Sequence, residues 1–150
     1  MEHGITAVKN IIAILLAACA LLATDMVHAQ EQRMVIVTST GSSIKAMSTK
    51  DVRRAYLGAS IVQDGIEIKP LRNQTDKLAE EVFLQRVLFM SAEAYERQLL
   101  AHTFRSGSRL QVFEKLTDLL DTLQNDNATI TFMLFGTAIT TPGIRIIGNL

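Results

Sequence analysis

Short β-prone runs alternate along the chain with longer stretches whose apolar residues recur at helical spacing. The β-branched run Met34–Ser39 (MVIVTS) is typical of a strand, and residues 66–71 (IEIKPL) alternate as a half-buried strand does. Two more β-prone runs, ATITFML and GIRIIGNL, occupy residues 128–134 and 143–150. The pattern therefore predicts one strand near residue 34, one near residue 66 and two at the C-terminal end.

Helix signals fill the stretches between these runs. Ser48 and Asp51 have the form of a capping box that opens a helix over residues 48–57, and Gly58 is its expected stop. A broad apolar stripe predicts a second helix from about residue 76 to residue 90.

Two further helices are predicted on either side of a polar break. Ser91 is placed to cap a helix over residues 92–104, which ends at the break RSGSR, residues 105–109. Ser108 and Gln111 resemble another capping box, so we expect a helix over residues 109–124. The predicted order is then β, α, β, α, α, α, β, β. Such alternation predicts an α/β fold in which a mostly parallel sheet is flanked by helices.

The N-terminal 29 residues have the form of a secretory signal. Lys9 supplies a positive charge, residues 11–23 are apolar, and Ala29 follows as a small residue suited to cleavage. The same segment would also fit an uncleaved anchor or, through Leu16 to Cys19, a bacterial lipoprotein box. We expect cleavage after Ala29, with residues 30–150 as one exported, periplasmic α/β domain of about 120 residues.

Composition limits the chemistry that remains. Loss of residues 1–29 removes one of 15 basic and two of 15 acidic residues, which leaves a net charge of +1 with histidine neutral. This balance, together with the lack of tryptophan, argues against nucleic-acid binding. Cys19 is the only cysteine, so a chain cleaved after Ala29 has no thiol for a disulfide, a zinc site or catalysis. No metal site or cofactor is expected.

The segment PLRNQTDKLAEEVF, Pro70 to Phe83, is the first candidate for chemistry. It takes the chain from a strand into a helix, and ligands of α/β sheets bind at such corners. Arg72, Asn73 and Thr75 can form an anion site there with the helix amides. The same residues also fit a plain capped helix start.

Two other segments offer comparable alternatives. Thr38, Ser39 and Thr40 begin a hydroxyl-rich loop after the first strand, which is expected to face the same cleft or to be an ordinary turn. Arg109, at the end of the break, can meet an anion or simply belong to a connector between helices.

The order of several short phrases resembles the phosphate-type periplasmic solute-binding proteins, in particular their small single-lobe members. Tyr56-Leu57-Gly58 stands where that family has F-x-G, residues 87–91 resemble its V-L-x-M/K-S phrase, and residues 104–109 resemble its F-x-G-x-G/S-R phrase. The resemblance covers most of residues 34–134. It implies a single lobe of the periplasmic-binding-protein type 2 fold.

The resemblance also implies a function. It predicts ligand binding by Thr38, Ser39, Thr40, Arg72, Asn73, Thr75 and Arg109, with phosphate or a related small oxyanion as the ligand. A membrane transporter or sensor would be the protein partner. Residues 72–77 lack the glycines of the family's phosphate loop, and Asp76 would repel an anion, so we expect weak binding. The alternative is an interaction module that keeps the fold without a ligand, for which residues 129–139 (TITFMLFGTAI) are a candidate apolar surface. The same residues also fit a core strand followed by a turn, which is the favoured interpretation.

An enzyme is not expected. His102 would be the only histidine left after cleavage, and the sequence has no G-x-S-x-G nucleophile elbow. The acidic pairs Glu80–Glu81 and Glu93–Glu96 fit solvated helix faces better than an acid–base pair.

Overall fold

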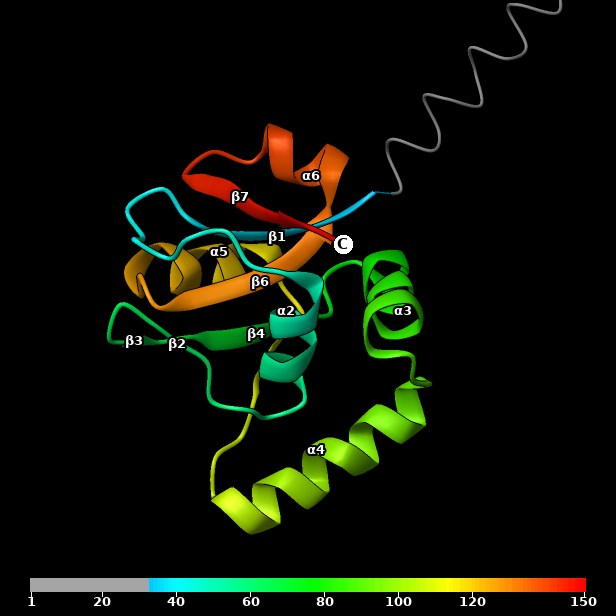
Figure 1. Ribbon diagram of the computed structural model, residues 1–150. Helices are drawn as coiled ribbons and strands as arrows, with labels where there is room; N and C mark the ends of the chain where they lie inside the picture. Colours follow the sequence, from blue (N-terminus) through cyan, green and yellow to red (C-terminus); the bar gives the residue numbers. More distant parts are fainter. Residues whose placement is uncertain (1–32) are drawn as a thin grey trace, which may run out of the picture. The chain divides into compact units, whose positions relative to one another are not determined.

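The computed structural model describes residues 33–150, which build one mixed sheet with helices on both faces (Figure 1). Residues 1–29, and with them the expected signal segment and Cys19, lie outside the described residues. Within the described residues, no helix is both long and apolar enough to cross a membrane.

Five strands form the main sheet in the order β5-β4-β6-β1-β7. Their bounds are β1 Met34–Ser39, β4 Lys69–Asn73, β5 Gln111–Phe113, β6 Thr129–Leu134 and β7 Ile144–Asn149. β4 pairs in parallel with both β5 and β6, whereas β1 pairs antiparallel with β6 and β7. Four strands therefore run in one direction and β1 alone runs against them. The predicted α/β fold with a mostly parallel sheet is confirmed.

A second, two-stranded sheet is a small hairpin. β2 (Val62–Gln63) pairs with β3 (Ile66–Glu67) around Asp64 and Gly65, whose φ angles of 49° and 81° are those of a tight hairpin turn. The predicted strand over residues 66–71 is therefore divided between β3 and β4.

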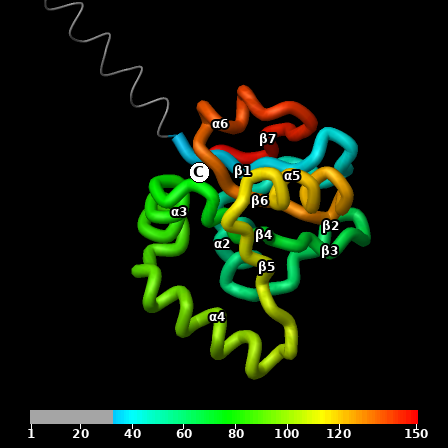
Figure 2. The backbone as a smooth tube through the Cα atoms, turned by 180° about the vertical axis from the view of Figure 1, so that it is seen from behind, coloured from blue at the N-terminus to red at the C-terminus, as the bar shows by residue number. Residues whose placement is uncertain are grey.

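Helices cover both faces of the main sheet. The remaining elements are α2 Thr49–Tyr56, α3 Lys77–Phe83, the π-helix η1 Leu84–Leu88, α4 Ala92–Ser106, α5 Leu116–Asn125 and α6 Phe135–Thr140. The tube in Figure 2, seen from behind, shows α5 in front of the sheet and α4 set apart from it. All six residues of β1 are buried, as expected for a strand that is covered on both faces.

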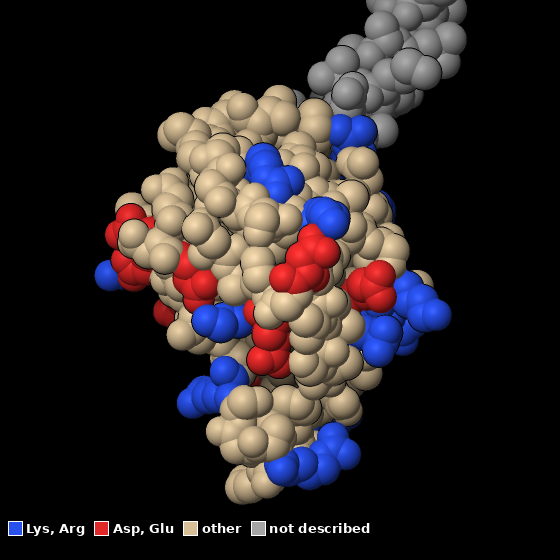
Figure 3. Space-filling view, turned by 60° about the vertical axis from the view of Figure 1, so that its left-hand side comes forward, with Lys and Arg blue, Asp and Glu red and all other residues tan. Residues whose placement is uncertain are grey.

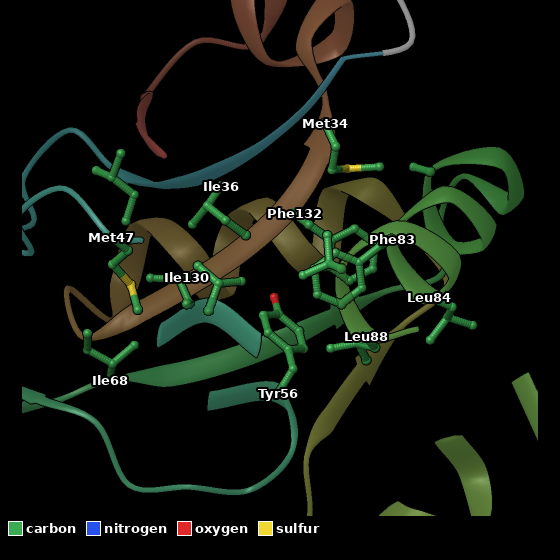
Figure 4. Close-up of a cluster of buried hydrophobic side chains, with 14 of the residues drawn as sticks. Met34, Ile36, Met47, Tyr56, Ile68, Phe83, Leu84, Leu88, Ile130 and Phe132 are labelled. Atoms are coloured by element: carbon green, nitrogen blue, oxygen red, sulfur yellow. The ribbon is translucent and has the colours of Figure 1, made fainter. Parts of the chain in front are cut away.

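Alternating side chains of β1 divide the core in two. Met34 and Ile36 pack toward α2, α3 and η1, whereas Val35 and Val37 pack toward α5 and α6. Figure 4 shows the first cluster, in which Tyr56, Phe83 and Phe132 gather from α2, α3 and β6. The rings of Phe83 and Phe132 stack with centroids 3.9 Å apart, and Tyr56 meets Phe83 edge-on at 4.7 Å.

Two buried tyrosines connect the helices of this cluster to the sheet. The Tyr56 hydroxyl donates to Leu71 O (2.9 Å), and the Tyr95 hydroxyl donates to Tyr56 O (2.9 Å). Burial is the main cause that raises the pKa of both phenols, so both remain protonated donors. The chain of bonds joins α4 to α2 and α2 to β4.

The helix predicted over residues 76–90 changes type along its length. The α-helix α3 passes directly into the π-helix η1 at Leu84. The helical segment ends at Phe89, a residue in the left-handed conformation (φ 56°) that is 69% exposed. The Arg53 guanidinium lies over the Phe89 ring, 4.9 Å from its centroid.

The Ser48 cap predicted for α2 is confirmed, because Ser48 Oγ accepts from Asp51 N.

The helix predicted over residues 109–124 is wrong in nearly its first half, residues 109–115. Residues Gln111–Phe113 form β5, which pairs with Leu71–Asn73, and the helix starts only at Leu116. Ser108 does not cap it, because the N-cap position is Lys115, which makes no side-chain cap bond. An apolar spacing compatible with a helix also fits a short edge strand, and the pairing with β4 decides between them.

The candidate apolar surface over residues 129–139 is mostly interior. Thr129–Leu134 is β6, whose first five residues are buried, and Phe135–Thr140 is α6. Ile139 is its one large apolar residue that is exposed, at 61%. This segment therefore forms a core strand and a helix that packs on the sheet.

Replacing Phe132 by alanine should lower the free energy of unfolding by about 3–5 kcal/mol, because it removes a stacked, fully buried ring. Phe104→Ala is the matched control, since Phe104 is 88% exposed on α4, and it should change stability by no more than about 0.5 kcal/mol. Urea unfolding of both variants measures the difference. Similar losses would show that the described aromatic cluster does not hold the core together.

Candidate functional site

A pocket of about 500 Å³ lies where β4, β5 and β6 end. Because these three strands are parallel, their carboxyl ends meet at one edge of the sheet, which is the usual place for ligands in such folds. Its lining comes from the β4–α3 corner, the β5–α5 loop, the end of β6 and α6, and comprises Asn73, Thr75, Asp76, Lys77, Ala79, Glu114, Leu116, Met133, Leu134 and Thr137. We call it the strand-end pocket.

Asn73 fixes the shape of the corner. Its Nδ2 donates to Phe132 O (2.9 Å), while its Oδ1 accepts from Thr75 N (3.0 Å) and from Thr75 Oγ1 (2.7 Å). A buried asparagine that bonds the backbone two residues ahead closes an Asx-turn. Asn73 and Thr75 therefore line the pocket, but most of their polar atoms already have protein partners.

Asp76 occupies the helix amides that an anion would need. Its Oδ1 accepts from Leu78 N (2.9 Å) and Ala79 N (3.2 Å), which makes it the N-cap of α3. A carboxylate at this place satisfies the amides and repels a second negative charge. Among the pocket's lining residues, Lys77 is the one cation, against Asp76 and Glu114.

Arg72 is a buried charge whose partners are protein carboxylates. It is 4% exposed, and its Nε and Nη2 donate to Glu80 Oε1 at 2.9 and 2.6 Å. Its Nη1 donates to Glu96 on α4, and Tyr95 lies under the guanidinium at 5.2 Å from the ring centroid. Burial by itself would lower the pKa of Arg72, but the bonds to Glu96 and Glu80 outweigh it and raise the pKa.

The role expected for Arg72 as an available anion ligand does not fit this geometry. Two carboxylates balance its charge, and Gln74 Nε2 adds a bond of 2.8 Å to Glu80. Glu80 and Glu96 are therefore ion-pair partners and not simply residues of solvated faces. The signal that could have shown the need for such partners is the arginine itself, because an arginine among the buried residues of a strand needs a nearby carboxylate.

Thr38, Ser39 and Thr40 lie at the opposite edge of the sheet. β1 runs against β4, so the carboxyl end of β1 is level with the start of β6. Thr38 Oγ1 donates to Thr129 O (2.8 Å) and Ser39 Oγ donates to Asn127 Oδ1 (3.1 Å). The expectation that this loop faces the same cleft as the β4–α3 corner is wrong, because it assumed that β1 runs parallel to its neighbours.

Arg109 does not join the corner either. It lines a different pocket between α4 and the amino-terminal end of β4. The seven predicted ligand residues are thus distributed over four places, because Arg72 lines neither pocket, and the strand-end pocket holds only Asn73 and Thr75.

Charge on the surface is mixed. On the face drawn in Figure 3, basic and acidic side chains alternate and neither sign forms a continuous patch. Within residues 33–150, no three histidine or acidic side chains come together in a way that could hold a metal ion.

Arg72→Ala should destabilise the fold by about 3 kcal/mol, because it leaves Glu80 without its buried partner. Arg109→Ala, which removes an exposed guanidinium, should change stability by no more than about 0.5 kcal/mol. Chemical unfolding with both variants tests this. An unchanged stability of Arg72→Ala would mean that the ion pairs are dispensable and that Arg72 is free for another role.

Comparison with known proteins identifies solved structures whose fold resembles that of this chain. No family model matches the sequence, and no curated protein matches it either. Among solved structures, an ABC-type phosphate transport receptor from Vibrio cholerae matches with a TM-score of 0.54 and 9% identity, over 77% of this chain and 45% of the receptor. PstS from Borrelia burgdorferi matches with a TM-score of 0.52 and 11% identity, over 77% and 46%.

The chain therefore spans about half the length of these receptors. At such low identity the likeness concerns the arrangement of helices and strands and not the ligand residues. Residues 33–150 share the fold of the matched part of these two receptors.

Proposed function

We propose that this protein is a solute-binding lobe that takes a small oxyanion, such as phosphate, in the strand-end pocket. The observation that carries the proposal is the position of that pocket at the shared carboxyl end of three parallel strands. The phosphate receptor from Vibrio cholerae, whose fold the chain shares, supports a solute of this class.

The chemistry of the pocket favours a protonated oxyanion. Lys77 can offset one negative charge, and Asp76 or Glu114 can accept a proton-bearing oxygen. At neutral pH phosphate carries such a proton and sulfate does not. Because Arg72 is already paired and the lining has more acidic than basic groups, affinity should be weak, on the order of millimolar.

An exported location and a membrane partner complete this proposal. The signal-like residues 1–29 support export to the periplasm, and the transport role of the receptors of shared fold supports a transporter or sensor as the partner. No enzymatic step is part of it.

A second candidate function is an interaction module without a ligand. One observation favours it. At the β4–α3 corner, Arg72 and the first amides of α3 already have carboxylate partners and are not available to an anion. A module of this kind would use the fold as a surface and would leave the pocket empty.

Calorimetric titration of the protein with phosphate and sulfate separates the two candidates. Saturable binding with phosphate preferred is the expected result. An absence of heat with both anions at millimolar concentration would reject the oxyanion site and favour the interaction module.

Asp76→Asn should reduce the preference for phosphate over sulfate, because it removes the negative charge while an asparagine still caps α3. Asp64→Asn in the β2–β3 hairpin is the matched control and should leave the preference unchanged. Titration of both variants with both anions measures the ratio of affinities. If Asp76→Asn binds as the unmutated protein does, Asp76 does not select the anion.

A further inference from the structure

A second pocket, of about 510 Å³, lies at the other edge of the sheet. It is bounded by the C-terminal half of α4, the end of α2 and the amino-terminal end of β4. Its volume falls within the range of small-molecule sites. The apolar part of its lining includes Ala55, Ile68, Pro70, Leu71, Leu99 and Leu110. We call it the α4 pocket.

One wall of the α4 pocket is a contact between α4 and the turn that follows α2. His102 Nε2 lies 3.0 Å from Gly58 O, and Ser106 Oγ lies 3.2 Å from the other ring nitrogen. Gly58 has φ 92°, and a Cβ there would lie 2.2 Å from His102 Cδ2. The imidazole thus packs directly on the glycine, and both ring nitrogens have protein partners, so His102 is a structural boundary of the pocket.

Tyr95 holds the other end of α4. It is 1% exposed, and its hydroxyl donates to Tyr56 O. Figures 1 and 2 both show α4 standing off the sheet from this end to the other. The helix is therefore attached near both ends, and the α4 pocket lies beneath its C-terminal half.

Four charged side chains line the α4 pocket, and two of them neutralise each other. Lys69 Nζ donates to Asp126 Oδ2 at 2.8 Å, and this bond is the main cause that lowers the pKa of Asp126. The other two are Glu67 and Arg109.

Glu67 and Arg109 have opposite charges and do not meet. Glu67 Oε1 accepts from Ser60 Oγ (2.6 Å), whereas Arg109 makes no hydrogen bond or ion pair with any described side chain. No ion pair joins the two within residues 33–150. One pocket therefore offers a carboxylate and a guanidinium, each without an opposite charge, beside an apolar lining.

We propose that the α4 pocket binds a short apolar peptide with free termini. Glu67 would receive the ammonium group, Arg109 would bind the carboxylate in its two-pronged geometry, and the apolar side chains would lie against Leu99 and Leu110. A small inorganic anion would use only Arg109 and leave the apolar lining exposed. The site is separate from the strand-end pocket and does not depend on the function proposed for it.

Three dipeptide probes test the proposal with the purified protein. Leu-Leu carries both charges, N-acetyl-Leu-Leu lacks the ammonium, and Leu-Leu-amide lacks the carboxylate. Calorimetry and amide chemical shifts should show that Leu-Leu binds best and that each blocked probe binds about threefold to tenfold more weakly, as expected for one exposed charge-assisted bond. Shifts should centre on Gly58, Leu99 and Leu110.

Charge-removing variants identify the end that each residue binds. In Arg109→Gln, Leu-Leu and its amide should bind equally, and in Glu67→Gln, Leu-Leu and its acetylated form should bind equally. Arg97→Gln on α4 and Glu81→Gln on α3 are exposed controls that should preserve the full pattern. Equal binding of all three probes to the unmutated protein, a pattern unaffected by Arg109→Gln and Glu67→Gln, or no binding at millimolar concentration would overturn the proposal.

Discussion

The buried Tyr56 is the residue on which the packing of the helices depends. Its ring meets Phe83 and Phe132, its hydroxyl bonds to the backbone of β4, and its own carbonyl accepts from Tyr95. One residue of α2, through its side chain and its carbonyl, thus contacts α3, β4, β6 and α4. The neighbouring Gly58 then lets the chain turn back while His102 packs against it. The Tyr56-Leu57-Gly58 phrase, which suggested a resemblance to solute-binding proteins, has a packing role in this structure.

Arg72 connects this packing to the chemistry at the strand ends. Its guanidinium bridges Glu80 in the corner and Glu96 on α4, so the corner and α4 share one buried charge. Breaking a buried pair leaves an uncompensated charge, which makes this arrangement hard to displace. At the β4–α3 corner, the hydrogen-bond donors of Arg72 and of the first turn of α3 already have protein partners. This limits how tightly the strand-end pocket can hold an anion.

The sequence was informative where a local signal determines structure. The Ser48 cap, the Asp64-Gly65 turn, the start of α4 after Ser91 and the strand at Met34 all follow from short patterns that need no distant partner. The prediction of a helix over residues 109–124 was partly wrong, because the apolar spacing there fits both a helix and a short strand. Only the pairing with β4 selects the strand at Gln111–Phe113. The prediction that β1 runs parallel to its neighbours was wrong for a similar reason, since periodicity predicts a strand but not its direction. That single error placed Thr38–Thr40 at the wrong edge. The partners of Arg72 are eight and 24 residues away, and no local pattern indicates them.

The position of β1 in the sheet has a consequence for how the chain becomes folded. β1 pairs only with β6 and β7, whose residues lie about a hundred positions later in the chain. Such long-range pairing is slow to form, and it requires that the last strands have been synthesised. During synthesis the β-branched run at Met34–Ser39 therefore has no strand to join, and the sheet closes only after residue 149 has emerged. A topology of this kind leaves the strand at Met34–Ser39 without its neighbours until β6 and β7 are available, so the five-stranded sheet is completed late in folding.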